Sequence, residues 1–451
     1  MGISLRDLKA MSRIIFIFVL SSAALIRTPL SFLMVVLKFA YPFLEKRIAF
    51  ERKNIIDKEC RSFKKDGLVA DFCFEVSSEG ELEQVRPLLE FFLRKNKKIE
   101  IIFASPSVEK KCLELAFEFP LLIRLMRLPV ASFMPFDFLF FQSPWSWVSA
   151  PKIIFCRYDF YPELLLFKYL SKKLILLSAA NKKPSWFKEQ AYGLFDLIVA
   201  ANKKEEDYFK NLFPHKKIYD FDFRVPRIFD RILNSHSSLN SIIEMKDYLS
   251  FLKQRPQDSK VILGSIWPSD LLILENKNWE DDLMTGKLHL LIVPHSLTIH
   301  SINEILKKLR TLFPKLPIYE ISSSLHGPDL CELLNSPGIV LLNRAGILCE
   351  FYTQFSFAYV GGGYERSIHS LLEPYLSNLQ VACGPLVTRS TEYDLIKELS
   401  PHEIHLLKNA ESFYNLFIEM AKKTPDSLIR TSIKVRSQAL MELIINEIEL
   451  C

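Results

Sequence analysis

Hydrophobic and polar positions alternate regularly along the chain from about residue 68 onward. Short runs of apolar and β-branched residues are separated by longer amphipathic stretches of helix length. Continuous apolar runs of this kind are typical of strands that are buried on both faces of a mostly parallel sheet. The first set of predicted strands covers 69–76, 99–104, 136–141, 152–157, 173–178, 196–200 and 217–221.

The alternation stops in a polar stretch around residues 225–257 and then starts again. We interpret this stretch as the link between two doubly wound α/β domains of similar size, over 46–235 and 236–451. Two domains agree with the chain length, because a single hydrophobic core stops growing near about 250–300 residues. The last stretch, 409–451, is expected to form helices that close the second domain. The second set of predicted strands covers 260–264, 288–293, 316–321, 338–342, 355–360 and 379–383.

The N-terminal segment, residues 1–45, is expected to be a membrane anchor. An apolar run over 14–26 is interrupted by Arg27 and resumes over 28–44. Either one tilted helix spans the membrane while Arg27 reaches toward the interface, or two apolar pieces lie in the interface as a monotopic anchor. A cleaved signal peptide is the alternative, because basic residues precede the apolar run and small residues follow it.

The charge of the chain is concentrated at this same end. Residues 1–65 contain 13 Lys or Arg and 5 Asp or Glu, a net charge of +8, whereas the remaining residues carry −2. This asymmetry indicates an anionic membrane surface as a partner and disfavours nucleic acid, which would need a basic stripe elsewhere. The eight cysteines are scattered without a Cys-x-x-Cys pair, which indicates a reducing compartment and no zinc site.

Three consecutive glycines follow the predicted strand 355–360, although the whole chain has only 13 glycines. Gly361, Gly362 and Gly363 leave the strand, and a helix is expected to start soon afterwards. Bare amide groups next to a helix N-terminus can bind a phosphate, which makes this turn a candidate anion site. The alternative is a tight turn whose backbone needs positive φ angles.

The residues after this turn are His369, Ser370, Glu373 and Pro374, and Cys-Gly-Pro follows at 383–385. This segment resembles the 3-deoxy-D-manno-octulosonic acid (Kdo) transferases of lipid A assembly, a family of membrane-anchored GT-B glycosyltransferases. Their signature runs Gly-Gly, then Gly-His-Asn, one residue, Leu-Glu-Pro, and later Gly-Pro. The resemblance implies two Rossmann-like domains that face each other across a cleft. It also implies that this segment binds the cytidine nucleotide, with Glu373 on the ribose or base.

The stretch Ser-Ser-Glu-Gly-Glu at 77–81 resembles the family's Ser-Val-Gly-Glu, whose glutamate is the proposed base. The resemblance therefore implies that Glu81 is the catalytic base. Its position suits this role, since it follows a predicted strand and opens a helix whose N-terminus favours the ionised carboxylate. The alternative is a capping box in which Ser78 is the N-cap and Glu81 is the third helical residue.

Other matching segments follow in order along the chain. Arg-Tyr-Asp-Phe-Tyr-Pro at 157–162 resembles an acidic and aromatic segment of the family, although by itself it could be a turn. Asp-Phe-Arg-Val-Pro-Arg at 222–227 resembles a family segment whose arginines could pair with a phosphate or carboxylate. The resemblance assigns Ser78, Asp159, Arg224 and Arg227 to the acceptor or transition state. It assigns to the donor Gly264, Ser265, His295, Gly361, Gly362, Gly363, His369, Ser370 and Glu373.

The chain also departs from the family pattern. Ser370 stands where the family has Asn, and His295 where it often has Arg. The expected function is an inverting transfer of Kdo from CMP-Kdo to a lipid A precursor at the cytoplasmic face of the cell inner membrane, without a metal cofactor. The alternatives are a GT-B transferase that uses another nucleotide sugar, or a catalytically inactive relative that binds lipid or nucleotide.

Overall fold

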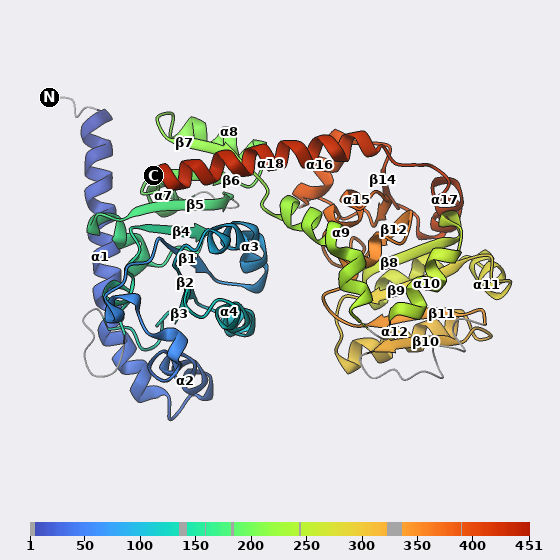
Figure 1. Cartoon of the computed structure of the whole chain (residues 1–451), viewed down its shortest axis with the longest axis horizontal. Coiled ribbons are helices and arrows are strands. Elements are labelled where there is room, and N and C mark those ends of the chain that lie inside the picture. Colours follow the sequence, from blue (N-terminus) through green and yellow to red (C-terminus); the bar gives the residue numbers. More distant parts are fainter. Residues whose placement is uncertain are drawn as a thin grey trace. The chain divides into compact units, whose positions relative to one another are not determined.

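The computed structural model describes residues 5–134, 142–157, 159–181, 185–242, 245–322, 336–388 and 390–451 (Figure 1). The predicted strand 136–141 lies outside these residues. The chain divides into two compact units. Unit 1 consists of Met1–Arg227 together with Ser437–Cys451, and unit 2 consists of Ile228–Arg436.

Unit 1 is built on a seven-stranded parallel sheet in the order β3-β2-β1-β4-β5-β6-β7. Its strands are β1 (Phe72–Val76), β2 (Ile99–Phe103), β3 (Ile123–Arg127), β4 (Lys152–Cys156), β5 (Lys173–Ala179), β6 (Leu197–Ala200) and β7 (Lys217–Asp220). Its helices are α1 (Leu5–Leu37), α2 (Pro42–Ile56), α3 (Glu79–Arg94), α4 (Pro106–Glu118), α5 (Pro144–Trp147), α6 (Pro162–Leu165), α7 (Trp186–Tyr192) and α8 (Lys203–Leu212).

Both faces of this sheet are buried, as the continuous apolar runs predict. On one face, Phe72 and Phe74 of β1 lie in a core that includes buried residues of α3 and α4. On the other face, Cys73 belongs to a core that includes Phe16 and Leu20 of α1. Although α1 is the N-terminal segment of the chain, it therefore packs as part of the globular unit.

Unit 2 is built on a second seven-stranded parallel sheet in the order β10-β11-β9-β8-β12-β13-β14. Its strands are β8 (Lys260–Ile266), β9 (His289–Pro294), β10 (Ile318–Ser322), β11 (Ile339–Asn343), β12 (Phe357–Val360), β13 (Gln380–Cys383) and β14 (Ile404–Leu406). The remaining helices are α9 (Arg224–Asn240), α10 (Lys246–Gln254), α11 (Asn278–Met284), α12 (Ile299–Leu312), α14 (Leu348–Tyr352), α15 (Leu372–Leu376), α16 (Thr391–Leu399), α17 (Phe413–Met420) and α18 (Ser427–Leu450).

Within the residues that the structure describes, the sequence pattern missed two strands, and both lie at an edge of their sheet. β3 contains Arg124 and Arg127, and the buried Arg127 guanidinium is paired with Glu109 at 2.6 Å and Asp57 at 2.7 Å. β14 has only three residues. Charged or very short edge strands do not produce a continuous apolar run, so hydrophobic periodicity does not reveal them.

The polar stretch interpreted as a link is helical, because α9 and α10 occupy most of it. The chain end also differs from the expectation that it closes the second domain. Ser437–Cys451, at the end of α18, belongs to unit 1, where Ile444 and Ile448 are fully buried in the same core as β1. The Lys152 ammonium on β4 donates to the Ile448 carbonyl oxygen at 2.9 Å.

Candidate functional site

The carboxyl edge of the unit 1 sheet carries the expected base, Glu81. After β1 ends, Ser78 is the N-cap of α3, and its Oγ accepts the Glu81 N–H at 3.3 Å. The Glu81 carboxylate turns back, so that its Oε2 accepts the Ser77 N–H at 2.6 Å. Glu81 is only 4% exposed. The helix cap considered in the sequence analysis is therefore present, and the catalytic role of Glu81 stays a prediction.

Two carboxyl groups with raised pKa values lie close together at this edge. Burial raises the pKa of Glu81, the Ser77 N–H lowers it, and the Asp159 carboxylate raises it again. Burial also raises the pKa of Glu75 well above its ordinary value. The Ser77 hydroxyl donates to Glu75 Oε1 at 2.7 Å, so Ser77 joins the two acids. The expectation that a helix N-terminus favours ionised Glu81 thus omitted the larger, opposing effect of burial.

Residues that follow β4 complete the unit 1 site. Arg157 has a φ of 69°, a left-handed conformation that is uncommon outside glycine. Its Nε donates to Gln84 Oε1 at 3.2 Å. Asp159 is half-buried, and the Tyr161 hydroxyl lies 3.4 Å from Ser77 Oγ. Strained backbone at the end of a parallel strand is a common feature of functional sites.

Sequence reasoning missed Glu75 and Tyr161 at this edge. A signal for Glu75 was available, because it is an acid in the middle of the otherwise apolar run Phe-Cys-Phe-Glu-Val of β1. Buried acids in a strand are rare unless a polar partner satisfies them. Tyr161 lies in the segment 157–162 that resembles the family, but only Asp159 was selected from that segment.

The two predicted arginines are engaged inside unit 1. Arg224 contacts Asp222 through Nη2 at 2.6 Å and Nε at 2.9 Å. Arg227 Nε lies 3.3 Å from Glu83 Oε2. A ligand phosphate or carboxylate would have to compete with these partners, so the role expected for both arginines stays a prediction.

The triple-glycine turn lies at the carboxyl edge of the unit 2 sheet, directly after β12. The Gly361 N–H donates to the Gly264 carbonyl oxygen at 2.8 Å. The Gly362 N–H donates to both oxygens of the Asp270 carboxylate, at 3.0 and 3.2 Å. The Gly363 N–H donates to a carbonyl oxygen of the loop that follows, at 2.6 Å. Each of the three amides already has an acceptor in the chain, so a phosphate would have to compete with these partners, and the role expected for the glycines in donor binding stays a prediction.

Close backbone contacts explain the glycines instead. A Cβ at Gly361 would lie 2.1 Å from the Ser265 carbonyl oxygen. Gly362 and Gly363 both have a φ of +88°, and a Cβ at Gly363 would lie 2.8 Å from the backbone of Gly384. Ser265 itself has a φ of 54°. The tight-turn alternative therefore accounts for this motif, since neither the space nor the dihedral angles suit a side chain.

The helix that follows the turn is α15, which has five residues and begins later than the sequence predicts. Its first amides are occupied by an anion from the chain itself. Glu392 Oε2 accepts the Leu371 N–H at 2.7 Å, the Leu372 N–H at 3.0 Å and the Ser370 hydroxyl at 3.2 Å. Ser370, expected at the nucleotide, therefore contributes to an internal helix cap.

An aromatic stack stands at the same edge of unit 2, after β8 and β9. The rings of His295 and His369 are stacked, with centroids 3.8 Å apart and planes at 11°. Trp267 Nε1–H donates to His369 Nε2 at 2.9 Å, which places the proton of the neutral His369 ring on Nδ1. The Arg366 guanidinium lies 4.1 Å from the Trp267 ring centroid. We call these four residues the Trp-His stack.

The imidazoles of the Trp-His stack favour the neutral form. Burial and, to a smaller extent, the nearby His295 lower the pKa of His369 to about 4. Burial and Arg366 lower the pKa of His295. Neutral stacked rings are suited to a planar heteroaromatic ligand such as a nucleobase. The sequence analysis singled out both histidines but missed Trp267 and Arg366.

Glu373 belongs to a network with an arginine that the sequence analysis did not select. Arg231 Nη1 lies 3.2 Å from Glu373 Oε1. The same guanidinium binds the Glu350 carboxylate in a bidentate manner, at 2.6 and 2.8 Å. Burial raises the pKa of Glu373 to about 7, although Arg231 opposes this shift. Glu373 therefore titrates near neutral pH.

Replacing Glu373 by Gln is expected to weaken the pH dependence of unfolding. Because the pKa of about 7 exceeds the ordinary value of 4.5, the folded state holds an extra proton between these values. The resulting stabilisation is complete below about pH 4.5 and is lost as the pH rises through about 7. Thermal unfolding near pH 5 and pH 7.5 measures this difference. Glu365→Gln, at an exposed site of unit 2, is the control, and an unchanged pH dependence in Glu373→Gln would contradict the prediction.

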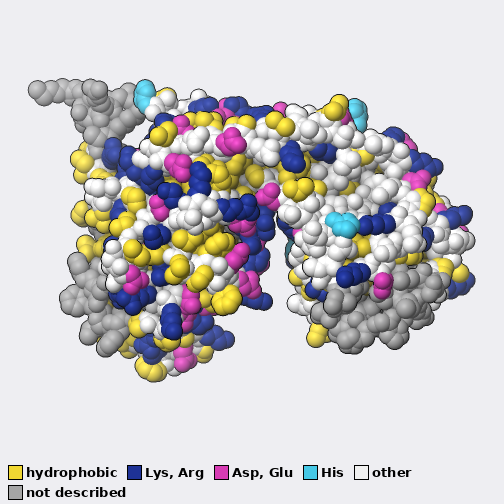
Figure 2. All heavy atoms as spheres, in the orientation of Figure 1, with side chains coloured by type: hydrophobic (Ala, Val, Ile, Leu, Met, Phe, Trp, Pro, Cys, Tyr) yellow, Lys and Arg dark blue, Asp and Glu magenta, His cyan; other side chains and the backbone are white. Residues whose placement is uncertain are grey.

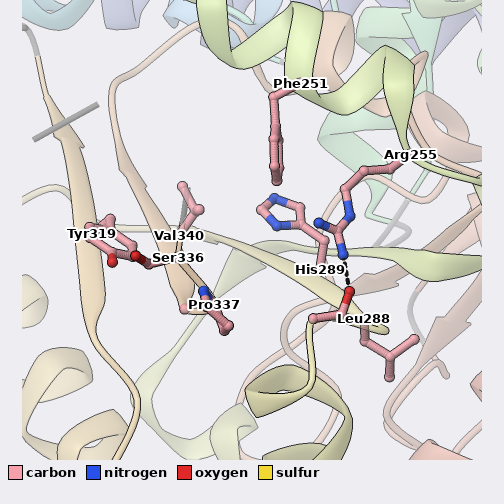
Figure 3. Close-up of a pocket in the computed structure, with 10 residues that line it drawn as sticks. Phe251, Arg255, Leu288, His289, Tyr319, Ser336, Pro337 and Val340 are labelled. Carbon is pink, nitrogen blue, oxygen red and sulfur yellow. Dashed lines mark hydrogen bonds between the residues drawn. The ribbon is translucent and has the colours of Figure 1, made fainter. Parts of the chain in front are cut away.

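The opposite edge of the unit 2 sheet contains a cavity of about 210 Å³ (Figure 3). It lies where β9 and β11 begin, and Phe251, Arg255, His289 and Tyr319 are among its lining residues. Arg255 donates to the Gly286 carbonyl oxygen, and burial lowers the pKa of His289 to about 3. Parallel α/β sheets bind ligands at the carboxyl ends of their strands, so this cavity is a poor candidate for the nucleotide site.

Comparisons with known proteins place the fold. No family model matches the chain. The 3-deoxy-D-manno-octulosonic acid transferase of Aquifex aeolicus (strain VF5) is 26% identical over 259 residues, which cover 56% of this chain and 61% of that protein. The match thus spans less than two thirds of that relative, and it supports a Kdo transferase-like relationship.

Among solved structures, UDP-GlcNAc 2-epimerase from Neisseria meningitidis bound to UDP-GlcNAc covers 83% of this chain and 100% of its own, with 11% identity and a TM-score of 0.51. The C-terminal CMP-Kdo binding domain of WaaA from Acinetobacter baumannii covers 49% of this chain and 97% of its own, with 15% identity and a TM-score of 0.31. The predicted fold class is confirmed as GT-B, with two parallel seven-stranded Rossmann-like units and an N-terminal apolar helix.

Proposed function

We propose that the chain is an inverting GT-B glycosyltransferase that moves Kdo from CMP-Kdo to a hydroxyl group of a lipid A precursor. The observation that carries this proposal is the similarity to a Kdo transferase over 259 residues. The GT-B fold agrees with it, since such folds hold a nucleotide sugar at the carboxyl edge of a parallel sheet. The proposed site of reaction is the cytoplasmic face of the cell inner membrane, because basic residues follow the apolar N-terminal segment.

Glu81 is the proposed general base in this reaction. Its carboxylate would take the proton of the acceptor hydroxyl as that oxygen attacks the anomeric carbon of the donor. The raised pKa of Glu81 makes it a stronger base than an exposed glutamate, provided that it remains ionised at the working pH. The Ser77 N–H, 2.6 Å from Oε2, favours the ionised form and orients the carboxylate. Glu75 and Asp159 are the other acids of this site.

The Trp-His stack is the proposed binding surface for the nucleotide. A cytosine ring can stack on the neutral imidazoles, and the Nδ1–H of His369 is a potential hydrogen-bond donor. Arg366 is exposed and can approach the donor phosphate, where negative charge develops as CMP leaves. The glycine turn would then shape this edge without donating its own amides. The chemistry proposed here requires no metal cofactor.

A GT-B transferase that uses another nucleotide sugar is the second candidate. His295 and Ser370 favour it, because both depart from the residues typical of Kdo transferases. Such a protein would keep the same acid in unit 1 and the same stacking surface in unit 2. The base and sugar of the preferred nucleotide distinguish the two candidates.

A thermal-shift comparison of CMP, UMP, UDP, AMP and GDP tests the proposed donor. Binding to the folded state alone stabilises it by about 2.7 kcal/mol when the nucleotide is present at 100 times its Kd. We expect CMP to raise the melting temperature most, and Trp267→Leu to reduce this shift. Ser78→Ala in unit 1 is the control and should keep it. Preferential stabilisation by UDP or GDP would favour the second candidate.

A transfer assay completes the test of the reaction. Purified full-length protein is incubated with CMP-Kdo and a lipid A precursor, and the glycolipid product is separated from the unmodified acceptor. Product that depends on both substrates supports the proposal. CMP binding without any product would instead favour the inactive relative considered above.

A further inference from the structure

α1 has two different faces along its apolar part. Met11–Leu37 is long and apolar enough to cross a membrane. One face nevertheless packs against unit 1, where Phe16, Leu20, Ala24 and Ser31 are buried. Their spacing of about four and seven residues puts them on one side of the helix. The opposite side, which we call the outer face of α1, exposes Ile14, Phe18, Leu25, Ile26, Phe32, Leu33 and Val36.

The contacts of the buried face extend along the helix. The Phe16 ring lies 5.2 Å from the Phe187 ring and 6.0 Å from the Trp186 ring, both at the start of α7. Trp186 Nε1–H donates to Ser12 Oγ at 2.9 Å. These contacts fix the first half of the apolar segment to the globular part of unit 1.

Arg27 fixes the second half. Its guanidinium forms an ion pair with Glu163 of α6, whose side chain is completely buried. It also donates to the Pro129 carbonyl oxygen at 3.1 Å and lies 5.0 Å from the Phe133 ring centroid. An arginine held in this way points into the protein and does not face the surroundings of the helix. Arg27 therefore does not interrupt the apolar outer face of α1.

The turn after α1 adds groups typical of a membrane interface. Phe39, Tyr41 and Phe43 are exposed, and the Lys38 ammonium lies 4.8 Å from the Phe39 ring centroid. Lys46 and Arg52 on α2 are also exposed. Aromatic rings and basic side chains next to an apolar surface are the combination that binds anionic headgroups. Figure 2 shows hydrophobic and basic side chains together over the region of α1 and α2.

We propose that α1 lies in the plane of an anionic phospholipid bilayer, with its outer face among the acyl chains and its buried face fixed to unit 1. This inference rests on the membrane-bound acceptor of the proposed function and specifies how the chain meets that membrane. A helix that crossed the bilayer alone would have to leave α6 and α7. It would then expose Phe16 and Leu20 and leave the Glu163 carboxylate buried without its cation, which is unfavourable.

Vesicle flotation of the full-length protein tests the bilayer contact independently of any activity. We expect binding to vesicles of phosphatidylcholine with phosphatidylglycerol, and at least tenfold weaker binding after the double change Phe18→Glu and Phe32→Glu. The control is Phe117→Glu on α4, a phenylalanine that is 87% exposed in the same unit. Equal binding of the double variant would overturn the proposed lipid face. Equal binding to pure phosphatidylcholine vesicles would overturn the preference for anionic lipid.

Protease accessibility distinguishes a helix in the plane from one that crosses. The full-length protein carries an epitope before Met1 and is reconstituted from the outside onto sealed vesicles. We expect a protease added outside to remove the epitope without detergent, because both ends of an in-plane helix stay on one side. Protection of the epitope until detergent opens the vesicles would show that α1 crosses the bilayer and would overturn the proposal. Neither measurement depends on CMP-Kdo, so a failed transfer assay leaves this result interpretable.

Discussion

Glu81→Gln is expected to lower CMP-Kdo-dependent transfer by at least about a hundredfold, the lower range of what a general base contributes. Glutamine keeps the shape of the side chain, and its amide oxygen can still accept the Ser77 N–H. The fold and the binding of CMP in unit 2 should therefore persist. Initial rates under saturating substrates, together with a CMP thermal shift, measure both properties in the same preparation.

Two further variants separate the catalytic role of Glu81 from its role in the helix cap. Glu79→Gln changes an acid in the same helical turn that pairs with Lys111 at 2.6 Å, and it should leave the rate unchanged. Ser78→Ala removes the N-cap oxygen and should cost about 1 kcal/mol of stability, so its melting temperature measures what the cap alone contributes. A fully active Glu81→Gln protein would restrict Glu81 to the cap.

The pH profile of the rate offers an additional check on the base. A base acts only when ionised, so the rate should fall on the acidic side as the pH decreases through the pKa of Glu81. Burial raises that pKa, so the loss should begin at a higher pH than for an exposed glutamate. If the residual rate of Glu81→Gln no longer falls at acidic pH, the fall seen in the unchanged protein is due to Glu81.

Gly361→Ala is expected to destabilise the protein by about 3 kcal/mol or more, the upper part of the range for overpacked interiors. Its Cβ would lie 2.1 Å from the Ser265 carbonyl oxygen, so backbone atoms would have to move. Any movement disturbs the Gly361 N–H bond to Gly264 that joins β12 to β8. For a unit of this size, the melting temperature should fall by roughly 6–12 °C.

Gly80→Ala is the matched control for this stability prediction. It lies in the first turn of α3, and a Cβ there would meet no atom within 4 Å. Alanine is also the better helix former, so this change should be neutral or slightly stabilising. Calorimetry of both variants measures the comparison. A Gly361→Ala protein as stable as Gly80→Ala would mean that the turn at β12 adapts easily.

The strands of both units were mostly predictable because burial on two faces leaves a continuous apolar run in the chain. The two doubly wound α/β domains followed from that alternation, whereas the GT-B class followed from the family resemblance. The missed strands β3 and β14 both lie at a sheet edge. The site was less predictable. Glu81, His295 and His369 were selected from their motifs, but Trp267 and Arg231 became visible only through their contacts.

The glycine motif shows why the site was harder to predict than the strands. Its position after a strand was plain in the sequence, and so was its capacity to bind an anion. Whether its amides were available depended on Asp270, a carboxylate 92 positions away in the chain, and on the Gly264 carbonyl of the neighbouring strand. The same is true at α15, where Glu392 supplies the anion that the sequence had suggested for a ligand.

By itself, the sequence determined most of the strands, their burial on both faces of the sheets, and the apolar and basic character of the N-terminal end. These are local properties, because they depend on the period and composition of neighbouring residues. Only the tertiary structure decided that Arg27 pairs with Glu163, that the end of α18 packs in unit 1, and that the glycine amides are already bonded. Hydrogen bonds and ion pairs join residues that are distant along the chain, and no local pattern specifies such partners.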